Sequence, residues 1–179
     1  MERPTSLPIG VTVMPLTTHS DSRGDLTEII RKEWHESPAP VQWIVTRTGS
    51  NIMRGVHVHL RNWDYACVVA GEMIVGLHDL RPRQPAVSAL LHLTGARLQM
   101  LVIPPGVAHG FYFASATTYF YALSHYWTPT GDLGCRWDDP ALGLSWPTSD
   151  PLLSQRDASA SSYEDLAKAI AMAKASVRS

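Results

Sequence analysis

Residues 53–72 read MRGVHVHLRNWDYACVVAGE, a strand-like stretch that contains two histidines, an aspartate and a closing glycine. Side chains alternate between the two faces of a β-strand, so His57 and His59 are expected to point to the same side. Asp64 follows His59 after four intervening residues, and Gly71 ends the run. Two imidazoles near a carboxylate can hold a metal ion, and they can also place a general base beside a substrate. The stretch alone leaves both interpretations open.

The chain on either side of this stretch has the same character, with short β-rich runs separated by Gly and Pro signals such as those at 21–24 and 104–106. Short strands with turns at roughly ten-residue spacing predict an all-β sandwich or barrel. Besides the strand that carries His57 and His59, the expected strands are residues 9–15, 26–30, 41–48, 65–70, 73–78, 89–93, 99–103 and 119–126.

The end of the chain changes from strand-like to helical. Ser161 and Glu164 have the spacing of a capping box, and an Ala-rich stretch follows to about Val177. Apolar residues recur there at helical spacing, which predicts a helix that packs on the β domain or on a partner chain. We therefore expect a β domain over residues 1–150 and a C-terminal segment with a helix over 151–179. The apolar stripe consists of Leu166, Ile170, Ala173 and Val177.

Composition restricts the class of protein but not its chemistry. The 179 residues suffice for one domain, and a formal net charge of −1 argues against a general nucleic-acid or membrane-surface binder. No apolar run reaches the roughly 18 residues that a membrane span needs, and the first residues lack a signal-peptide layout. Cys67 lies in an apolar run and Cys135 in an expected polar loop, so we expect two free thiols. These features lead us to expect a cytoplasmic location.

Two spacings resemble the motifs of the cupin superfamily, whose fold is a β-barrel of jelly-roll type. The first is the spacing of His57, His59, Asp64 and Gly71, and the second is Pro104-x-Gly106-x2-His109. The resemblance implies a site for a divalent transition metal, although cupin motifs normally carry Glu where Asp64 stands. The implied metal ligands are His57, His59, Asp64 and His109.

A closer resemblance covers the chain from near its N-terminus to Asp157, in six blocks that occur in one order. The series resembles the dTDP-4-dehydrorhamnose 3,5-epimerase family. It implies an isomerase that inverts C3, C5 or both in a nucleotide-linked 4-keto-6-deoxy sugar, without a metal or an organic cofactor. It also implies a jelly-roll cupin with a C-terminal helix, paired as a homodimer through extended sheets. The blocks are DSRGDLTE (21–28), MRGVH (53–57), PPGVAHGF (104–111), YFYALSHYW (119–127), RWDDPALGLSWP (136–147) and LSQRD (153–157).

The family's catalytic roles transfer to three residues of this sequence. The resemblance makes His57 the base, Asp157 the carboxylate that orients it, and Tyr121 the proton donor on the far side. Arg23 corresponds to the arginine at the nucleotide pyrophosphate, and the N-terminal segment that carries it is expected to serve the neighbouring subunit. The full set of implied substrate-binding residues is Arg23, Glu28, Gln42, Arg54, His59 and His109.

This chain departs from the family pattern at two site positions. Asp64 stands where the family has a lysine that holds the enolate oxygen, and His59 stands where it often has Gln. Asp64 is expected to pair with Arg54 or Arg61. The alternatives are a metal-dependent cupin enzyme, such as a sugar isomerase or an oxygenase, and a non-catalytic relative that only binds nucleotide sugars. His57 could not be both metal ligand and free base through one nitrogen atom.

Overall fold

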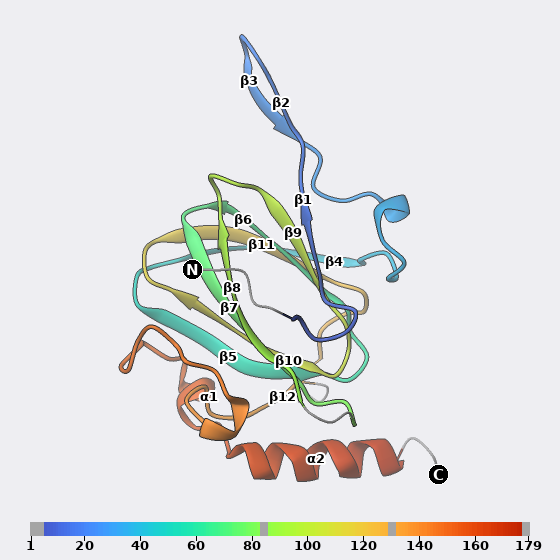
Figure 1. Cartoon of the computed structure of the whole chain (residues 1–179), viewed down its shortest axis with the longest axis vertical. Helices are drawn as coiled ribbons and strands as arrows, with labels where there is room; N and C mark the ends of the chain where they lie inside the picture. Colours follow the sequence, from blue (N-terminus) through green and yellow to red (C-terminus); the bar gives the residue numbers. More distant parts are fainter. Residues whose placement is uncertain (1–5, 83–85, 129–131, 177–179) are drawn as a thin grey trace.

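A computed structural model describes residues 6–82, 86–128 and 132–176 of the chain. Two five-stranded antiparallel sheets face each other, and a two-stranded hairpin projects from one end (Figure 1). In the first sheet the strands follow in the order β1 (Thr12–Pro15), β9 (Gln99–Ile103), β6 (Asp64–Ala70), β11 (Thr117–Leu123) and β4 (Gln42–Thr48). In the second sheet the order is β12 (Asp132–Gly134), β5 (Ile52–His59), β10 (Val107–Phe113), β7 (Glu72–Asp79) and β8 (Ser88–Thr94).

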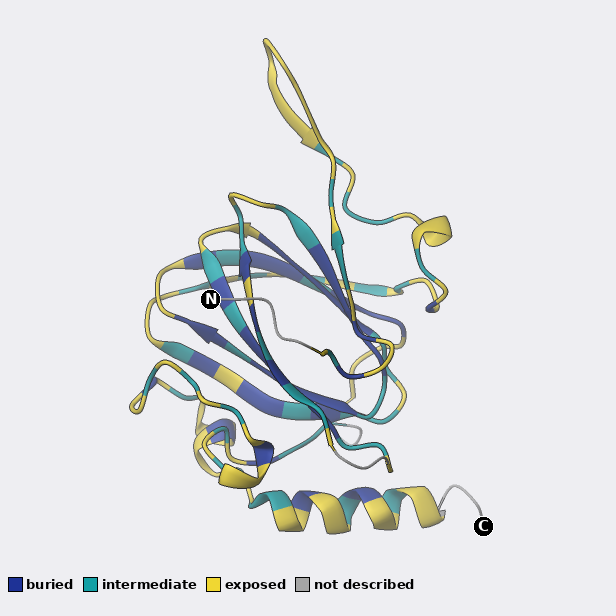
Figure 2. Ribbon diagram, in the orientation of Figure 1, coloured by how far each residue is buried: buried dark blue, intermediate teal, exposed yellow. Residues whose placement is uncertain are grey.

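The main core lies between the two sheets, where apolar side chains from both meet. Figure 2 shows the inner parts of the strands as buried and the projecting hairpin as exposed. Because both faces of β7 are covered, its last five residues, from Val75 to Asp79, form a continuous buried run rather than an alternating one. Two facing antiparallel sheets confirm the expected jelly-roll fold. The core residues include Ala66, Val68, Leu101 and Tyr119 from the first sheet and Met73, Val75, Leu91 and Phe113 from the second.

Three strands correspond to no expected run: β2 (Thr18–Asp21), β10 and β12. β2 is exposed throughout and pairs only with β3 (Gly24–Thr27), so it has no apolar face to detect. β10 carries a glycine in its interior, and β12 has only three residues. The run expected at 26–30 is wrong beyond residue 27, and the run expected at 119–126 is wrong beyond residue 123, where the chain leaves the sheet.

A second apolar cluster lies on the outer side of the second sheet, under the C-terminal helix α2 (Tyr163–Ser176). Leu166 and Ile170 are buried in it, so the helix packs on the second sheet (Figure 1). The helix is capped one residue later than expected, because the hydroxyl of Ser162 accepts from the backbone N–H of Asp165 and donates to its carboxylate. Val177 lies outside the described residues.

The other helical turns among the described residues are short. The 3₁₀ turn Lys32–Trp34 lies between β3 and β4, and the 3₁₀ turn Pro140–Leu142 and the four-residue helix α1 (Gln155–Ala158) lie between β12 and α2. Cys67 and Cys135 are free thiols, but Cys135 is buried in the second cluster and not in a polar loop as expected. No helix among the described residues is long and apolar enough to cross a membrane.

Candidate active site

A cavity of about 500 Å³ lies between the two sheets and receives side chains from both. The second sheet contributes three histidines, an arginine and Asp132, and the first contributes Asp64, Thr46 and three tyrosines. A pocket of this size, on which polar side chains converge from several strands, is typical of a small-molecule site. The polar residues that line it are Thr46, Arg54, His57, His59, Asp64, Tyr65, His109, Tyr119, Tyr121, Trp127, Asp132, Ser154, Arg156 and Asp157.

An irregularity in β5 turns three of its polar residues toward the cavity. Simple alternation would put Arg54 and His57 on opposite faces, since they are an odd number of residues apart. In the ladder with β10, however, His57 pairs with His109 while Arg54 pairs with Phe111, so β5 has one extra residue between the two pairs. Gly55 lies at this point with φ +111°, and a Cβ there would be 2.9 Å from the Gly110 Cα. Glycine therefore allows the bulge that brings Arg54, His57 and His59 together.

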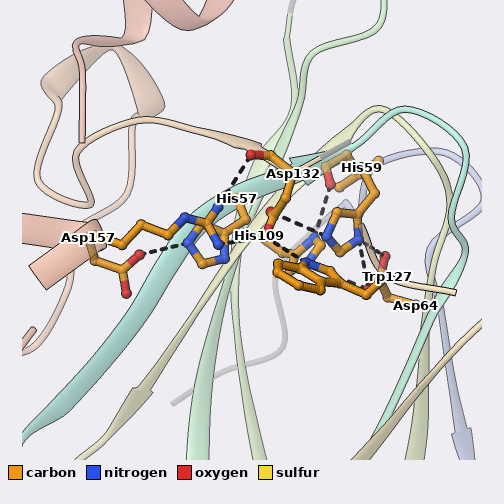
Figure 3. A network of polar contacts seen from close by, with 9 residues as sticks. His57, His59, Asp64, His109, Trp127, Asp132 and Asp157 are labelled. Atoms are coloured by element: carbon orange, nitrogen blue, oxygen red, sulfur yellow. Dashed lines mark hydrogen bonds and ion pairs between the residues drawn. The ribbon is translucent and has the colours of Figure 1, made fainter. Parts of the chain in front are cut away.

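His57 forms a hydrogen-bonded pair with Asp157 (Figure 3). Its Nε2 lies 2.7 Å from Asp157 Oδ1, and the Asp157 side chain is only 6% exposed. Asp157 is held in α1, where the Ser154 hydroxyl accepts from its backbone N–H at 3.1 Å. Burial alone would raise the pKa of Asp157, but the hydrogen bond and charge of His57 and the contact with Ser154 hold it below 3.8. An ionised Asp157 fixes the orientation of His57 and stabilises its protonated form.

Tyr121 lies on β11, in the sheet opposite to the one that carries His57. Burial raises the pKa of the Tyr121 hydroxyl, and the nearby charge of Arg54 opposes part of that rise. Tyr121 therefore keeps its proton at neutral pH. The pocket thus has an imidazole on one wall and a protonated phenol on the other.

His59 is held between two aspartates (Figure 3). Its Nδ1 lies 2.9 Å from Asp64 Oδ2, and its Nε2 lies 3.5 Å from Asp132 Oδ1, its cross-strand neighbour on β12. Burial would lower the pKa of His59, but the two aspartates outweigh it and raise the pKa to about 10. The expected pairing of Asp64 with Arg54 or Arg61 is wrong, because the side chain of Asp64 faces His59 across the end of the pocket.

His109 is the most deeply buried of the three pocket histidines. Its Nδ1 lies 3.2 Å from the Val107 carbonyl oxygen and so donates to it, which leaves Nε2 with a free lone pair. That Nε2 lies 4.0 Å from Asp64 Oδ1. Burial lowers the pKa of His109, so this imidazole is neutral at pH 7.

The structure brings six of the nine expected site residues into the cavity and leaves three outside it. Arg23 lies in the projecting hairpin, 87% exposed and paired with Asp21. Glu28 pairs with Arg31 beside a separate hollow at the base of the hairpin. Gln42 does not line the cavity, but its side-chain oxygen accepts from the backbone N–H of Trp127, which does. The six in the cavity are His57, Asp157, Tyr121, Arg54, His59 and His109.

Three of the cavity residues that the sequence does not predict form one polar cluster. Asp132 follows a Pro-Thr-Gly segment with no strand signal, and only the pairing of β12 with β5 places it beside His59. Arg156 lies in the LSQRD block and binds Asp132 at 2.5 Å. Trp127 donates its Nε1–H to the same carboxylate at 2.8 Å, and its ring is 45% exposed.

Only three of the four expected metal ligands come together. His59, Asp64 and His109 each offer a ligand atom, and these atoms lie within 4.8 Å of one another. The expected quartet is wrong in its fourth member, because His57 does not belong to this group and its Nε2 is bound to Asp157. With His57 outside the group, its role as a base does not compete with metal binding.

Comparison with known proteins identifies relatives of this chain. The family model described as dTDP-4-dehydrorhamnose 3,5-epimerase matches residues 5–165. The enzyme of that name from Pseudomonas aeruginosa is 30% identical over 156 residues, which cover 81% of this chain and 86% of the relative. The one from Neisseria gonorrhoeae is 31% identical over 163 residues, 86% of this chain, but the match spans only 49% of that longer relative.

Solved structures of epimerases have the same fold. The Mycobacterium tuberculosis rmlC epimerase superposes with a TM-score of 0.83 at 25% identity, over 94% of this chain and 92% of that one. Legionella pneumophila RmlC, solved in complex with dTDP-4-keto-L-rhamnose, gives a TM-score of 0.81 at 25% identity, over 92% and 96% of the two chains. With the family model covering nearly the whole β domain and α1, the resemblance is confirmed, and the chain belongs to the dTDP-4-dehydrorhamnose 3,5-epimerase family.

Proposed function

We propose that this protein is an epimerase that inverts C3, C5 or both in a nucleotide-linked 4-keto-6-deoxy sugar. One observation carries the proposal: an imidazole oriented by a buried carboxylate, His57 with Asp157 at 2.7 Å, lies in a cavity whose opposite wall carries Tyr121. Inversion of a carbon next to a ketone needs a base on one face of the sugar and an acid on the other. The two walls offer these groups.

In the proposed reaction His57 removes the proton. Because Nε2–H donates to Asp157, the neutral imidazole carries its lone pair on Nδ1. Nδ1 removes the proton from the carbon beside the ketone. The C–H electron pair forms the enolate, and its negative charge moves to the carbonyl oxygen. Tyr121 then donates its proton to the opposite face of that carbon, and the sugar regains its ketone with inverted configuration. The reaction is redox-neutral, so these two groups do not require an organic cofactor.

Positive charge near the pocket suits a nucleotide-linked substrate. Arg54 lines the cavity without a carboxylate partner among the described residues, so its guanidinium remains available to an anionic oxygen. The half-exposed ring of Trp127 offers a flat surface on which a nucleotide base could stack. The Legionella relative, crystallised with dTDP-4-keto-L-rhamnose, suggests the class of ligand.

We further propose that the protein works as a homodimer in which the hairpin of one subunit serves the pocket of the other. The edge strand β4 exposes an apolar row, with Trp43 48% and Val45 65% exposed, as expected for a strand that pairs with a second copy. The hairpin holds Arg23 away from the cavity of its own chain. In the pocket of the partner subunit, this arginine would bind the pyrophosphate of the substrate, which is the role that the family resemblance implies for it.

Mixing two inactive variants tests the shared site. The activity measured is formation of the inverted sugar. If Arg23 acts across the dimer, heterodimers of Arg23→Ala with Tyr121→Phe contain one intact pocket, and mixing restores this activity to about one quarter of the wild-type level. If Arg23 acts within its own chain, every pocket in the mixture lacks one residue and activity does not return. Light scattering gives the oligomeric state in the same samples.

Solvent deuterium exchange tests the activity itself. The protein is incubated in D₂O with dTDP-4-keto-6-deoxyglucose, and deuterium at C3 and C5 is read by NMR. We expect wash-in at one or both carbons in the wild type and none with His57→Gln. Tight binding of several nucleotide sugars without exchange would instead favour a non-catalytic binding protein.

A further inference from the structure

Three side chains that commonly bind transition metals converge inside the cavity that also holds the base–carboxylate pair. They come from different strands: His59 from the end of β5, Asp64 from the start of β6 and His109 from β10. One ligand atom of each lies within 4.8 Å of the others, and all three side chains are buried or nearly so. Since the strands belong to both sheets, the fold fixes their separation.

The nitrogen atoms of both imidazoles are oriented as in a metal site. His109 donates Nδ1–H to the Val107 carbonyl, so its Nε2 lone pair faces Asp64 Oδ1 across a 4.0 Å gap. His59 directs Nδ1 at Asp64 and Nε2 at Asp132. Metal-binding histidines typically donate their outer N–H to a carbonyl or carboxylate, which fixes the tautomer. Val107 and Asp132 occupy these two outer positions.

The carboxylate of Asp132 is built into this arrangement rather than free to move. Its Oδ2 is bound by Arg156 and by the indole of Trp127, while its buried Oδ1 receives no hydrogen bond and faces His59 Nε2. A buried carboxylate oxygen without a hydrogen bond is costly. The Nε2–H of His59 points at this oxygen from 3.5 Å, and it stays in place when Nδ1 exchanges its proton for a metal ion.

We propose that His59 Nδ1, the Asp64 carboxylate and His109 Nε2 bind one divalent first-row transition ion, with Asp132 as the outer partner of His59. Two imidazoles and one carboxylate form a ligand set suited to zinc, manganese, iron or cobalt, and the open cavity leaves coordination positions for water or a substrate oxygen. The ion replaces the proton that now joins His59 to Asp64. His57 is not a ligand and stays paired with Asp157. The site does not depend on the proposed epimerase reaction.

The test is direct metal binding by tag-free protein stripped with a chelator. Calorimetric titration with Co²⁺ and Zn²⁺ is expected to give one saturable site per chain. Asp64→Asn and His109→Gln are expected to abolish it, and Asp132→Asn to weaken it about 10–100-fold as an outer partner. His92→Gln is the matched control, because His92 forms an exposed pair with Glu72 on the edge hairpin β7–β8. Circular dichroism checks that each variant is folded.

X-ray absorption spectroscopy of the zinc-loaded wild type keeps the test independent of mutant folding. The proposal predicts two imidazole ligands with oxygen ligands completing the shell, and His57→Gln is expected to leave the spectrum unchanged. Three imidazoles, or loss of binding in His57→Gln, would contradict this ligand set. The proposal would be overturned if the wild type showed no saturable binding, or if Asp64→Asn bound the metal as well as the wild type. The cluster would then be only an ion pair of His59 with Asp64 and Asp132.

Discussion

Replacing Asp157 with Asn isolates the role of the carboxylate that orients His57. The substitution keeps the shape of the side chain and removes its charge. Asp157 is 6% exposed and lies 2.7 Å from His57 Nε2, so solvent cannot substitute for the lost interaction. The backbone N–H of residue 157 still donates to Ser154, so α1 keeps its cap.

The size of the effect follows from the kind of hydrogen bond that is lost. A hydrogen bond to a charged group contributes about 1.5–3 kcal/mol, and each 1.36 kcal/mol of barrier corresponds to about tenfold in rate. The imidazolium that forms during proton removal loses this stabilisation while the ground state loses less. We therefore expect kcat to fall by about 10–150-fold with a much smaller change in KM.

The assay is the initial rate of deuterium wash-in at saturating nucleotide sugar. Asp150→Asn is the matched control, because Asp150 is exposed and its substitution removes the same charge seven positions earlier in the chain. A kcat for Asp157→Asn within twofold of the wild type would refute the role assigned to the pair.

The pH dependence of stability provides a second readout on Asp157. The pKa of Asp157 is lowered below 3.8 in the folded protein, so its contribution to stability is present above pH 3.8 and is lost as pH falls through the folded pKa. The difference in Tm between wild type and Asp157→Asn is therefore expected to shrink below about pH 4. A difference in Tm that stays constant with pH would contradict this account.

Other perturbations test the remaining parts of the structure. Tyr121→Phe is expected to keep deuterium wash-in but to lower formation of the inverted sugar about 100-fold, because the acid is lost while the base remains; equal loss of both would contradict the assignment. Gly134→Ala places a Cβ 2.5 Å from the Val56 carbonyl oxygen and 3.1 Å from the His57 ring, so we expect about 100-fold lower kcat, with circular dichroism unchanged. In chelator-treated protein, His59→Gln is expected to be less stable than the wild type by a margin that is full below pH 6.5. That margin is lost as pH rises through about 10, because the folded-state pKa of His59 is raised; urea unfolding across this range measures it. Leu166→Ala removes a side chain on the buried face of α2 that is 1% exposed, and it is expected to lower the free energy of unfolding by about 2–5 kcal/mol in the same assay.

The fold and the catalytic pair could be predicted from the sequence because their signals are local or lie in motifs. Turn residues and strand runs indicated a β sandwich, and the capping box located α2 to within one residue. His57 and Asp157 are 100 residues apart, and no periodicity connects them. Only the resemblance of the MRGVH and LSQRD blocks to the epimerase family predicted that the two act together, and the 2.7 Å contact agrees with it.

The surroundings of His59 could not be predicted, because they depend on strand register. The pairing of Asp64 with an arginine was a reasonable expectation from charge alone, but two aspartates from different sheets flank His59 instead. Asp132 is brought there by a three-residue strand that has no sequence signal. The bulge at Gly55, which sets the direction of Arg54, is likewise a property of two paired strands rather than of either one.

The central claim is that His57 transfers protons to and from carbons beside a sugar ketone. Deuterium incorporation into dTDP-4-keto-6-deoxyglucose, followed by NMR for wild type and His57→Gln side by side, tests it most directly. The account predicts incorporation at C3, C5 or both with the wild type, and loss of that incorporation in the variant while nucleotide-sugar binding persists. Incorporation at an undiminished rate in His57→Gln, or none with the wild type despite binding, would contradict it.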